Sequence, residues 1–376
     1  MAKINPFKAV RPSKKNIQYF SSKSYKMYSE SELKKELIEN PISFLSIINI
    51  KKDPSFSLEK SKRYELVKEK FEVFKASNVL TKDTASCYYI YETAQTNGHL
   101  FCGVIATASV EDYDTNVIKK HEATISKREN TFKNYLKTVR FNAAPVLLTY
   151  PDNLTLETGV KNAKLNASEF NFWSTKNETH KLWCIDNKED VQCIQKAFQK
   201  IPSLYIADGH HRSASSALLA RELNSEGQTA SIASSNHFLT YLIPESQLKI
   251  YDYNRVIKDL NGLNTETFLA KISINFELEN KGSKPYKSSK RHNMSMYLEG
   301  TFYSLSLRAT KQNNRSAIHQ LDTHILQTHL LEPILGITNV RTNSRIDYIY
   351  GSDSLEQIKA TVDRKDHSVG FGLFPI

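Results

Sequence analysis

The spacing of apolar residues along the chain predicts several amphipathic helices. The clearest runs from Ser61 to Ala76, where apolar and aromatic residues recur every three or four positions: Tyr64, Val67, Phe71 and Phe74. An earlier helix is predicted to begin after Ser29, because Ser29 and Glu32 have the spacing of a capping box, and to end at Asn40 before Pro41. Further helices are expected over 121–138, 189–200, 213–223 and 318–335, the last ending at Gly336.

Shorter apolar runs rich in β-branched and aromatic residues predict strands. The pair Asn97-Gly98 separates two of them and is a strong hairpin signal. A second hairpin is expected around Glu299-Gly300. The predicted strands are 43–48, 87–93, 100–110, 144–150, a short one from Trp183, 204–207, 238–243, 294–298 and 302–307. Residues 151–180 are interpreted as a variable excursion whose strands the pattern does not define.

Together these elements predict an α+β (mixed α/β) fold. The 376 residues suffice for one large or two ordinary domains. We expect three regions: an N-terminal α/β region over 1–110, a core over 111–245 with an insertion at 151–180, and a C-terminal α/β region over 246–376.

Composition narrows the class of protein without defining it. Hydrophobic residues make up 40% and charged residues 24%, as in ordinary globular proteins. The start, Met1 to Phe7, lacks the apolar core of a signal peptide, and no run approaches a membrane span, so a cytoplasmic location without membrane association is expected. The four cysteines have no metal-type spacing. The net charge of +11 suits either nucleic acid or an anionic small molecule, but the lysines are mostly interleaved with glutamates.

The densest group of chemically capable residues is Asp208-Gly209-His210-His211-Arg212. It lies between the predicted strand 204–207 and the predicted helix from Ser213. A helix N-terminus offers free N–H groups and the positive end of the helix dipole, which together favour anions. Arg212 can hold phosphate oxygens, the histidines can donate hydrogen bonds or move a proton, and Asp208 can bind a divalent cation or orient a histidine.

A second candidate site is His121-Glu122-Ala123-Thr124. Glu122 is expected at the start of a helix, where its charge would also simply favour the helix dipole. The pair gains significance from its order in the chain: His-Glu, a polar helix, the strand at Pro145 to Leu148, and then the Asp-Gly-His-His-Arg turn.

This ordered series resembles the ParB/sulfiredoxin-like superfamily, in particular its free-amino-acid kinases. The whole chain is similar to a large bacterial domain-of-unknown-function family with the same signature, to which residues 4–11, 89–92 and Trp183 also correspond. The resemblance implies a ParB/sulfiredoxin-like nucleotide-binding core with additional N- and C-terminal α/β elements. It implies a phosphotransferase that moves a nucleotide phosphate to the hydroxyl of L-serine or a similar small molecule, with Mg²⁺ as cofactor and ATP, or ADP, as donor.

The resemblance also implies residue roles. Glu122 would be the general base, with His121, Asp208 and His210 as further catalytic residues. Nucleotide or phosphate would be held by Gly209, His211, Arg212, Ser213 and Thr124, and Asp208 would be the metal ligand. No Walker-type motif and no protein-kinase motif set is present.

Two departures from the family pattern stand out. Residues 24–28 read Ser-Tyr-Lys-Met-Tyr where relatives carry a Pro-Pro-Tyr-Asp-Val type segment. The sequence ends at Phe374-Pro375-Ile376 where relatives continue into a tail, which we expect to alter a lid, an interface or substrate closure.

Three other classes of function compete with the kinase. A ParB-type nucleotide-gated DNA-binding protein fits the basic charge, but no helix-turn-helix pattern follows the signature, so a nucleic-acid partner is not favoured. A metal-dependent hydrolase could use His121, Glu122, His210 and His211. A sulfiredoxin-like enzyme would need a cysteine where His210 stands, and the nucleophilic thiol is therefore missing.

Overall fold

The computed structural model divides the chain into two compact units, Met1–Leu248 and Lys249–Ile376. It describes residues 1–22, 25, 28–49, 59–95, 98–122, 124–174, 178–227, 234–250, 253–311, 318–340, 343–350 and 353–374. In this part of the chain no helix is long and apolar enough to cross a membrane. The three functional regions expected from the sequence remain a prediction.

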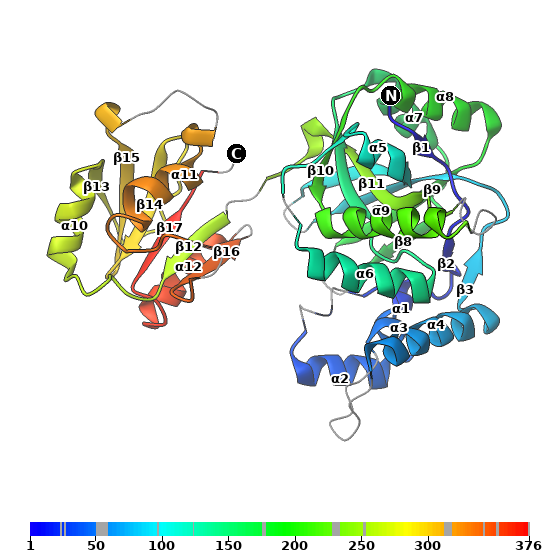
Figure 1. The fold of residues 1–376 in the computed structure, drawn as a ribbon, viewed down its shortest axis with the longest axis horizontal. Coiled ribbons are helices and arrows are strands. Elements are labelled where there is room, and N and C mark those ends of the chain that lie inside the picture. Colours follow the sequence, from blue (N-terminus) through cyan, green and yellow to red (C-terminus); the bar gives the residue numbers. More distant parts are fainter. Residues whose placement is uncertain are drawn as a thin grey trace. The chain divides into compact units, whose positions relative to one another are not determined.

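The first unit is built on one large mixed sheet of nine strands (Figure 1). Eight strands follow one another in the order β6-β10-β7-β11-β5-β4-β9-β8, and β1 pairs with β5. Their bounds are β1 Ile4–Asn5, β4 Tyr88–Ala94, β5 Leu100–Ser109, β6 Ile118–Lys119, β7 Val146–Tyr150, β8 Phe170–Trp173, β9 Thr179–Ile185, β10 Leu204–Asp208 and β11 His237–Pro244. Only two neighbouring pairs are parallel, β6 with β10 and β7 with β11.

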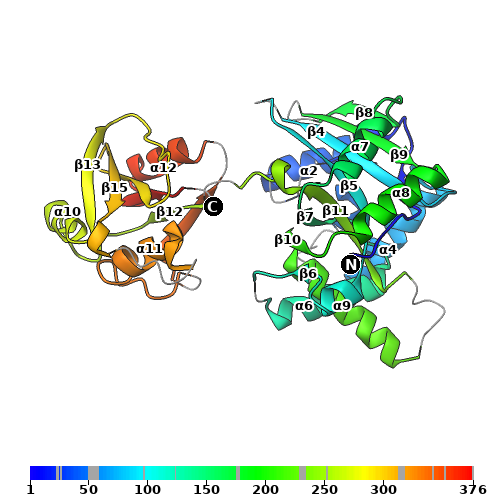
Figure 2. The same ribbon diagram turned by 90° about the horizontal axis from the view of Figure 1, so that it is seen from above.

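Helices and a small second sheet complete the first unit. The strands β2 (Val10–Pro12) and β3 (Leu80–Lys82) form an antiparallel pair of their own. Helices α6 and α9 pack side by side, as Figures 1 and 2 both show. The helix bounds are α1 Ile17–Phe20, α2 Glu30–Glu39, α3 Leu45–Ile48, α4 Lys60–Ala76, α5 Val110–Asp114, α6 Ser126–Val139, α7 Leu154–Ala163, α8 Lys188–Gln199 and α9 His210–Ser225.

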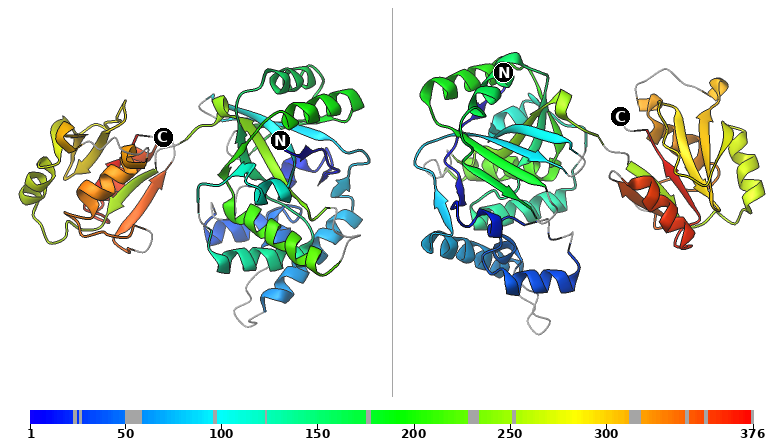
Figure 3. Two further views of the ribbon diagram at one scale, coloured as in Figure 1. Left: turned by 45° about the horizontal axis from the view of Figure 1, so that its top comes forward. Right: turned by 180° about the vertical axis from the view of Figure 1, so that it is seen from behind.

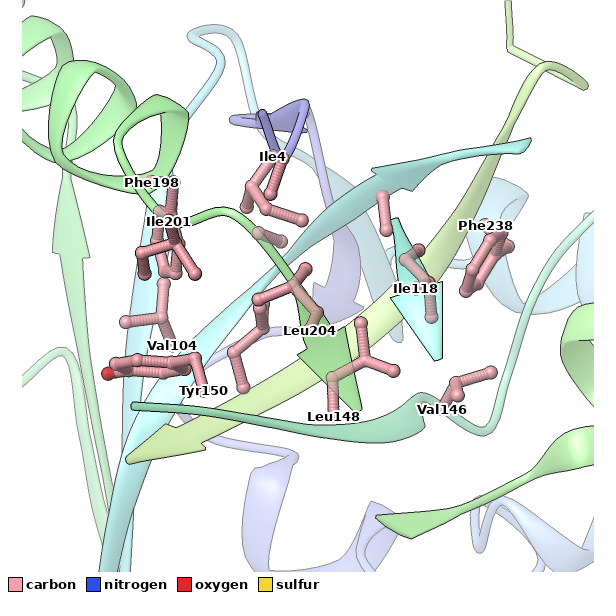
Figure 4. Close-up of a cluster of buried hydrophobic side chains, with 14 of the residues drawn as sticks. Ile4, Val104, Ile118, Val146, Leu148, Tyr150, Phe198, Ile201, Leu204 and Phe238 are labelled. Atoms are coloured by element: carbon pink, nitrogen blue, oxygen red, sulfur yellow. The ribbon is translucent and has the colours of Figure 1, made fainter. Parts of the chain in front are cut away.

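The main core of the first unit lies on one face of the large sheet. Because side chains alternate along a strand, Val146, Leu148 and Tyr150 of β7 point to the same face, and all three are buried. Figure 4 shows them beside Phe198 and Leu204, with Ile118 and Phe238 close by. A smaller cluster under α4 and α6 contains Val67, Phe74, Leu80 and Val139.

The second unit contains a six-stranded antiparallel sheet in the order β13-β15-β14-β17-β12-β16. Helix α12 packs against it, and the right-hand view of Figure 3 shows this helix in red. The bounds are β12 Tyr253–Ile257, β13 Phe276–Gly282, β14 Asn293–Leu298, β15 Thr301–Leu307, β16 Ile346–Tyr350, β17 Val369–Gly372, α10 Thr265–Ser273, α11 Asp322–Leu326 and α12 Ser354–Asp363. Two short 3₁₀ turns, Ala309–Lys311 and Ile318–Gln320, and the π-helix Gln327–Leu331 lie between β15 and β16, and a 3₁₀ turn over Glu245–Gln247 precedes β12.

Most predicted elements are confirmed. Both hydrogen bonds of the capping box between Ser29 and Glu32 are present at the start of α2. Helix α4 buries Val67 and Phe74, and Tyr64 and Phe71 pack beside them. Strands β4 and β5 pair as an antiparallel hairpin with Gly98 at φ +80°, although Asn97 lies outside the described residues. The second hairpin, β14 with β15, is also present.

Several predictions of local structure are wrong. Residues 43–48 form a turn and helix α3 rather than a strand, because Ile47 packs against α4 in the smaller cluster. The interval 151–180, for which only uncertain strands were expected, holds the strand β8 but also the helix α7, which was not predicted. The predicted helix 318–335 is broken into a 3₁₀ turn, α11 and the π-helix, although Gly336 does follow it with φ +66°.

Candidate functional site

The parallel pairing of β6 with β10 brings the two sequence motifs to the same edge of the sheet. Leu204 lies opposite Ile118 and Tyr205 opposite Lys119. Because parallel strands end on the same side, the segment after β6 and the turn after β10 leave the sheet together. The first segment carries His121 and Glu122. The second is tighter than predicted, because Asp208 ends β10 and α9 already begins at His210, so Gly209 alone lies between strand and helix. Two segments that are 89 residues apart in the sequence therefore become neighbours.

Gly209 makes the abrupt change from strand to helix. Its φ of +103° is a conformation that residues with a Cβ rarely adopt. A Cβ built at this position would lie 3.0 Å from the guanidinium atoms of Arg212. No side chain caps α9, whereas Arg212 and Ser213 already donate their N–H groups to the carbonyl of Gly209. The first N–H groups of the helix, at His210 and His211, therefore lack the side-chain acceptor that a helix start usually has.

His210 occupies the centre of the site. Its side chain is 5% exposed, and its Nδ1 lies 3.6 Å from a carboxylate oxygen of Glu122, too far for a direct hydrogen bond. The N–H of His121 donates to its Nε2 at 3.5 Å, and the two imidazole rings meet edge to face at 4.3 Å between centroids. Burial, reinforced by His121, lowers the pKa of His210 below its ordinary value. The ring is thus held in its neutral form, with Nε2 as acceptor and Nδ1 facing Glu122.

Glu122 itself is half-exposed, and its position corrects the sequence prediction. It does not begin a helix, because α6 starts only at Ser126. The expected stabilisation of a helix dipole by this carboxylate is therefore absent, while Glu129 occupies the first turn of α6 instead. Thr124 donates its hydroxyl to Glu129, and Ala123 lies outside the described residues.

Arg212 and Asp208 are paired with each other across one turn. The guanidinium donates to the carboxylate of Asp208 and, through its other terminal nitrogen, to the carbonyl oxygen of Pro145 just before β7. The Asp208 side chain is 72% exposed and that of Arg212 is 33% exposed. An incoming anion would therefore meet an arginine that is already oriented by two acceptors.

The two remaining predicted residues of this segment, His211 and Ser213, differ in the hydrogen bonding of their side chains. Nδ1 of His211 is buried and has no hydrogen-bond partner among the described residues. Ser213 is fully buried, and its hydroxyl donates to the carbonyl of His210 at 3.0 Å. His211 thus has a buried polar atom without a partner in this part of the chain, whereas the Ser213 hydroxyl is engaged by its own helix.

A preformed metal centre would need several His, Cys, Asp or Glu side chains close together. Within the described ranges, no three His, Cys, Asp or Glu side chains gather in a way that would hold a metal ion. All four cysteines are free thiols. A hydrolase built on His121, Glu122, His210 and His211 would have to assemble its ligands on binding the metal.

Two features of the site could not be predicted from the sequence. The carbonyl of Pro145 orients Arg212, yet a backbone acceptor leaves no compositional signal. The strand β6, which positions His121 and Glu122, has only two residues and is too short to show a periodic pattern.

The structure is that of a mixed α/β protein in which the N-terminus of α9 lies beside the segment that carries His121 and Glu122. The chain belongs to the DUF1015 family, described as a protein of unknown function, whose profile matches residues 4–324. No curated protein matches the sequence significantly.

Several solved structures resemble the chain distantly. One is a conserved hypothetical protein from Pyrococcus furiosus, at 11% identity and a TM-score of 0.30, covering 71% of this chain and 78% of that one. Another is a free serine kinase in complex with AMP, at 12% identity and a TM-score of 0.30, covering 72% and 76%. A glutamate-to-alanine variant of a free serine kinase in complex with ADP gives 12% identity and 0.29, covering 71% and 75%. At these values the likeness carries no argument about activity.

Proposed function

We propose that this protein is a phosphotransferase of the free-serine-kinase type. It moves a phosphate from a nucleotide to the hydroxyl of L-serine or a similar small molecule. The observation that carries the proposal is the meeting of the Glu122 carboxylate with the N-terminus of α9 at one sheet edge, with His210 at 3.6 Å from Glu122. This arrangement pairs a proton acceptor with an anion site, which is what phosphoryl transfer to a hydroxyl requires.

The anion half of the site is the turn from Asp208 to Arg212. The start of α9, a helix of 16 residues, directs N–H groups and a positive dipole end toward the phosphates. Arg212 contributes a planar cation, Gly209 permits close approach of the backbone, and His211 offers the unpartnered Nδ1. Thr124 and Ser213 are assigned supporting roles, in which Ser213 would act mainly through its backbone.

The acidic half is Glu122, which receives the proton. In the proposed step the substrate hydroxyl oxygen forms a bond to the transferred phosphorus, and the bond from that phosphorus to the nucleotide oxygen breaks. The hydroxyl proton passes to the Glu122 carboxylate, while neutral His210 and its neighbour His121 hold the carboxylate segment in place. General-base help of this kind is worth on the order of 10²- to 10⁴-fold.

Mg²⁺ would neutralise charge on the phosphates, and Asp208 is the residue that would hold it. Mg²⁺ binds through one or two carboxylates together with phosphate oxygens, so a single exposed carboxylate beside an anion site fits this ion. The pairing of Asp208 with Arg212 holds this carboxylate next to the arginine that would meet the phosphates. The ParB/sulfiredoxin-like character of the core belongs to the same proposal.

The decisive experiment is incubation with free L-serine, Mg²⁺ and ATP, ADP, CTP or pyrophosphate, with O-phosphoserine read by mass spectrometry. Product that disappears in Glu122→Gln supports the kinase and its base together. If no donor gives product although nucleotide binds, L-serine is not the acceptor, and either another small hydroxyl compound as acceptor or a ParB-type nucleotide-gated protein becomes the better proposal. Salt-dependent retention on DNA would then support that class.

A further inference from the structure

A large cavity lies on the face of the nine-stranded sheet opposite the main core. Its volume is about 860 Å³, within the size range of small-molecule sites. Its floor is made by alternate residues, Tyr89 and Tyr91 of β4, Ile105 and Thr107 of β5, and Leu239 of β11. Their immediate neighbours, such as Ile90, Val104 and Phe238, are buried in the main core. Because successive side chains in a strand point to opposite faces, the cavity and the core are separated by the sheet.

The other walls come from elements that carry neither the His121-Glu122 motif nor the Asp208–Arg212 motif. They include β2 and β3, α1, α3, one stripe of α4 and the end of α6. Lys68, Phe71 and Lys75 line the cavity from α4 at a spacing of three to four residues, so they share one helical face. Phe71 stacks on Phe141 with ring centroids 4.2 Å apart. The walls therefore present flat aromatic surface together with cationic groups.

The charge of this lining is strongly one-sided. Among the described residues around the cavity, seven are Lys or Arg and one is acidic, Glu72. Lys181 and Trp183 lie two residues apart on β9, so their side chains point to the same face of the sheet. Because Trp183 is buried in the main core, the side chain of Lys181 points to the core face as well. Six cations therefore remain for the cavity.

Two of these six cations have acidic partners. Arg11 pairs with Asp83 and Glu169, and Lys75 pairs with Glu72. The other four have no ion pair within the described part of the chain: Lys8, Lys68, Lys82 and Arg140.

We propose that this cavity binds an organic anion with a flat aromatic body, at a site distinct from the Asp208–Arg212 turn. Lys68, which is partly buried, and the exposed Lys8, Lys82 and Arg140 give the cavity an excess of positive charge, which favours an anionic occupant. The aromatic walls favour a planar apolar body. Neither the His121-Glu122 segment nor the turn from Asp208 to Arg212 contributes to the lining. The proposal therefore does not depend on the kinase activity.

The test uses 8-anilinonaphthalene-1-sulfonate, an aromatic sulfonate, as the probe. Fluorescence titration and calorimetry should show saturable binding to one site, weakened by salt. The uncharged analogue N-phenyl-1-naphthylamine should bind about tenfold more weakly, because it lacks the anionic group. Equal affinity for the two probes would overturn the assignment of an anion site.

A pair of charge-matched variants locates the binding. Lys68→Glu with Lys82→Glu should raise the Kd of the sulfonate by about tenfold or more. Lys62→Glu with Lys70→Glu changes the net charge equally but alters residues outside the lining, and it should leave the Kd within about twofold. Equal weakening in both variants, or no saturable binding by the wild type, would overturn the proposal.

Two further variants keep the result interpretable. If the glutamate pair fails to fold, Lys68→Gln with Lys82→Gln removes the same cations without reversing them, and an unchanged Kd there would count against the site. Arg212→Ala should leave sulfonate binding intact. A failure of the cavity proposal is therefore distinguishable from a failure of the proposed kinase.

Discussion

The imidazole of His210 lies 3.6 Å from the carboxylate of Glu122. His210 begins helix α9 directly after β10, and Glu122 lies in the segment after β6, the strand that pairs with β10 at the edge of the sheet. His210 is almost fully buried, whereas Glu122 is half-exposed. A buried neutral ring thus lies beside a carboxylate that a substrate can reach. This relationship joins the two sequence motifs into one candidate active site.

Glu122→Gln should abolish turnover and preserve nucleotide binding. The amide keeps the size and polarity of the side chain but cannot accept a proton, so we expect a loss of about 10²- to 10⁴-fold in phosphoserine formation. Mass spectrometry measures the product and calorimetry measures nucleotide affinity. Glu157→Gln on α7 is the matched control, because Glu157 is exposed and pairs only with Lys161. Equal activity in Glu122→Gln would remove the base assignment.

Arg212→Lys should weaken nucleotide binding by about tenfold. The guanidinium reaches Asp208 and Pro145 with two separate nitrogens, and a single ammonium cannot reproduce that planar orientation. Arg221→Lys on the same helix is the control, since Arg221 also pairs with an aspartate, Asp114, but away from the turn. Identical affinities in both lysine variants would show that Arg212 does not touch the nucleotide.

Gly209→Ala should destabilise the first unit by about 1–3 kcal/mol, because it forces a residue with a Cβ to φ +103°. The new Cβ would also press on the guanidinium of Arg212. Gly159→Ala in α7 should instead be neutral or stabilising by about 0.5–1 kcal/mol, since its Cβ would make an ordinary contact with Ile194 at 3.5 Å. Chemical denaturation followed by circular dichroism compares the two. A Gly209→Ala protein as stable as the wild type would contradict the strained turn.

His210 should make the free energy of unfolding depend on pH. Burial lowers the pKa of His210 in the folded protein, so the unfolded chain binds more protons as the pH falls below about 6.5. Stability is therefore retained above that value and lost progressively at more acidic pH. His210→Gln should lose less stability between about pH 7 and pH 5 than the wild type. His180 and His329 have pKa values lowered in the same direction and remain in both proteins, so the difference isolates His210. Parallel pH profiles would refute a buried neutral ring.

The sequence was most informative where a local pattern determines local structure. The capping box at Ser29, the stripe on α4 and the strand-turn-helix at Gly209 all depend on residues close in sequence, and each was confirmed. The run 43–48 was misinterpreted because a short apolar segment has the same composition in a strand and in a buried helix. Packing of Ile47 against α4 decides between them.

The geometry of the candidate site was less accessible to sequence reasoning. The start of α6 at Ser126 could not be located, because Ile125 provides no side-chain cap there. The contact of Arg212 with Pro145 depends on the antiparallel pairing of β7 with β10, which is a long-range property of the sheet. The cavity beneath α4 likewise depends on how α1, α3 and α4 cover the sheet.

The brevity of β6 has a consequence for how the site would operate. This strand has two residues, so few backbone hydrogen bonds tie the His121-Glu122 segment to the sheet, whereas the Asp208–Arg212 turn is continuous with a 16-residue helix. A brief detachment of β6 would withdraw Glu122, the proposed proton acceptor, and leave the proposed phosphate-binding half assembled. Nucleotide capture and chemistry would then be separable in time, and amide exchange near Lys119 would proceed faster than exchange along α9.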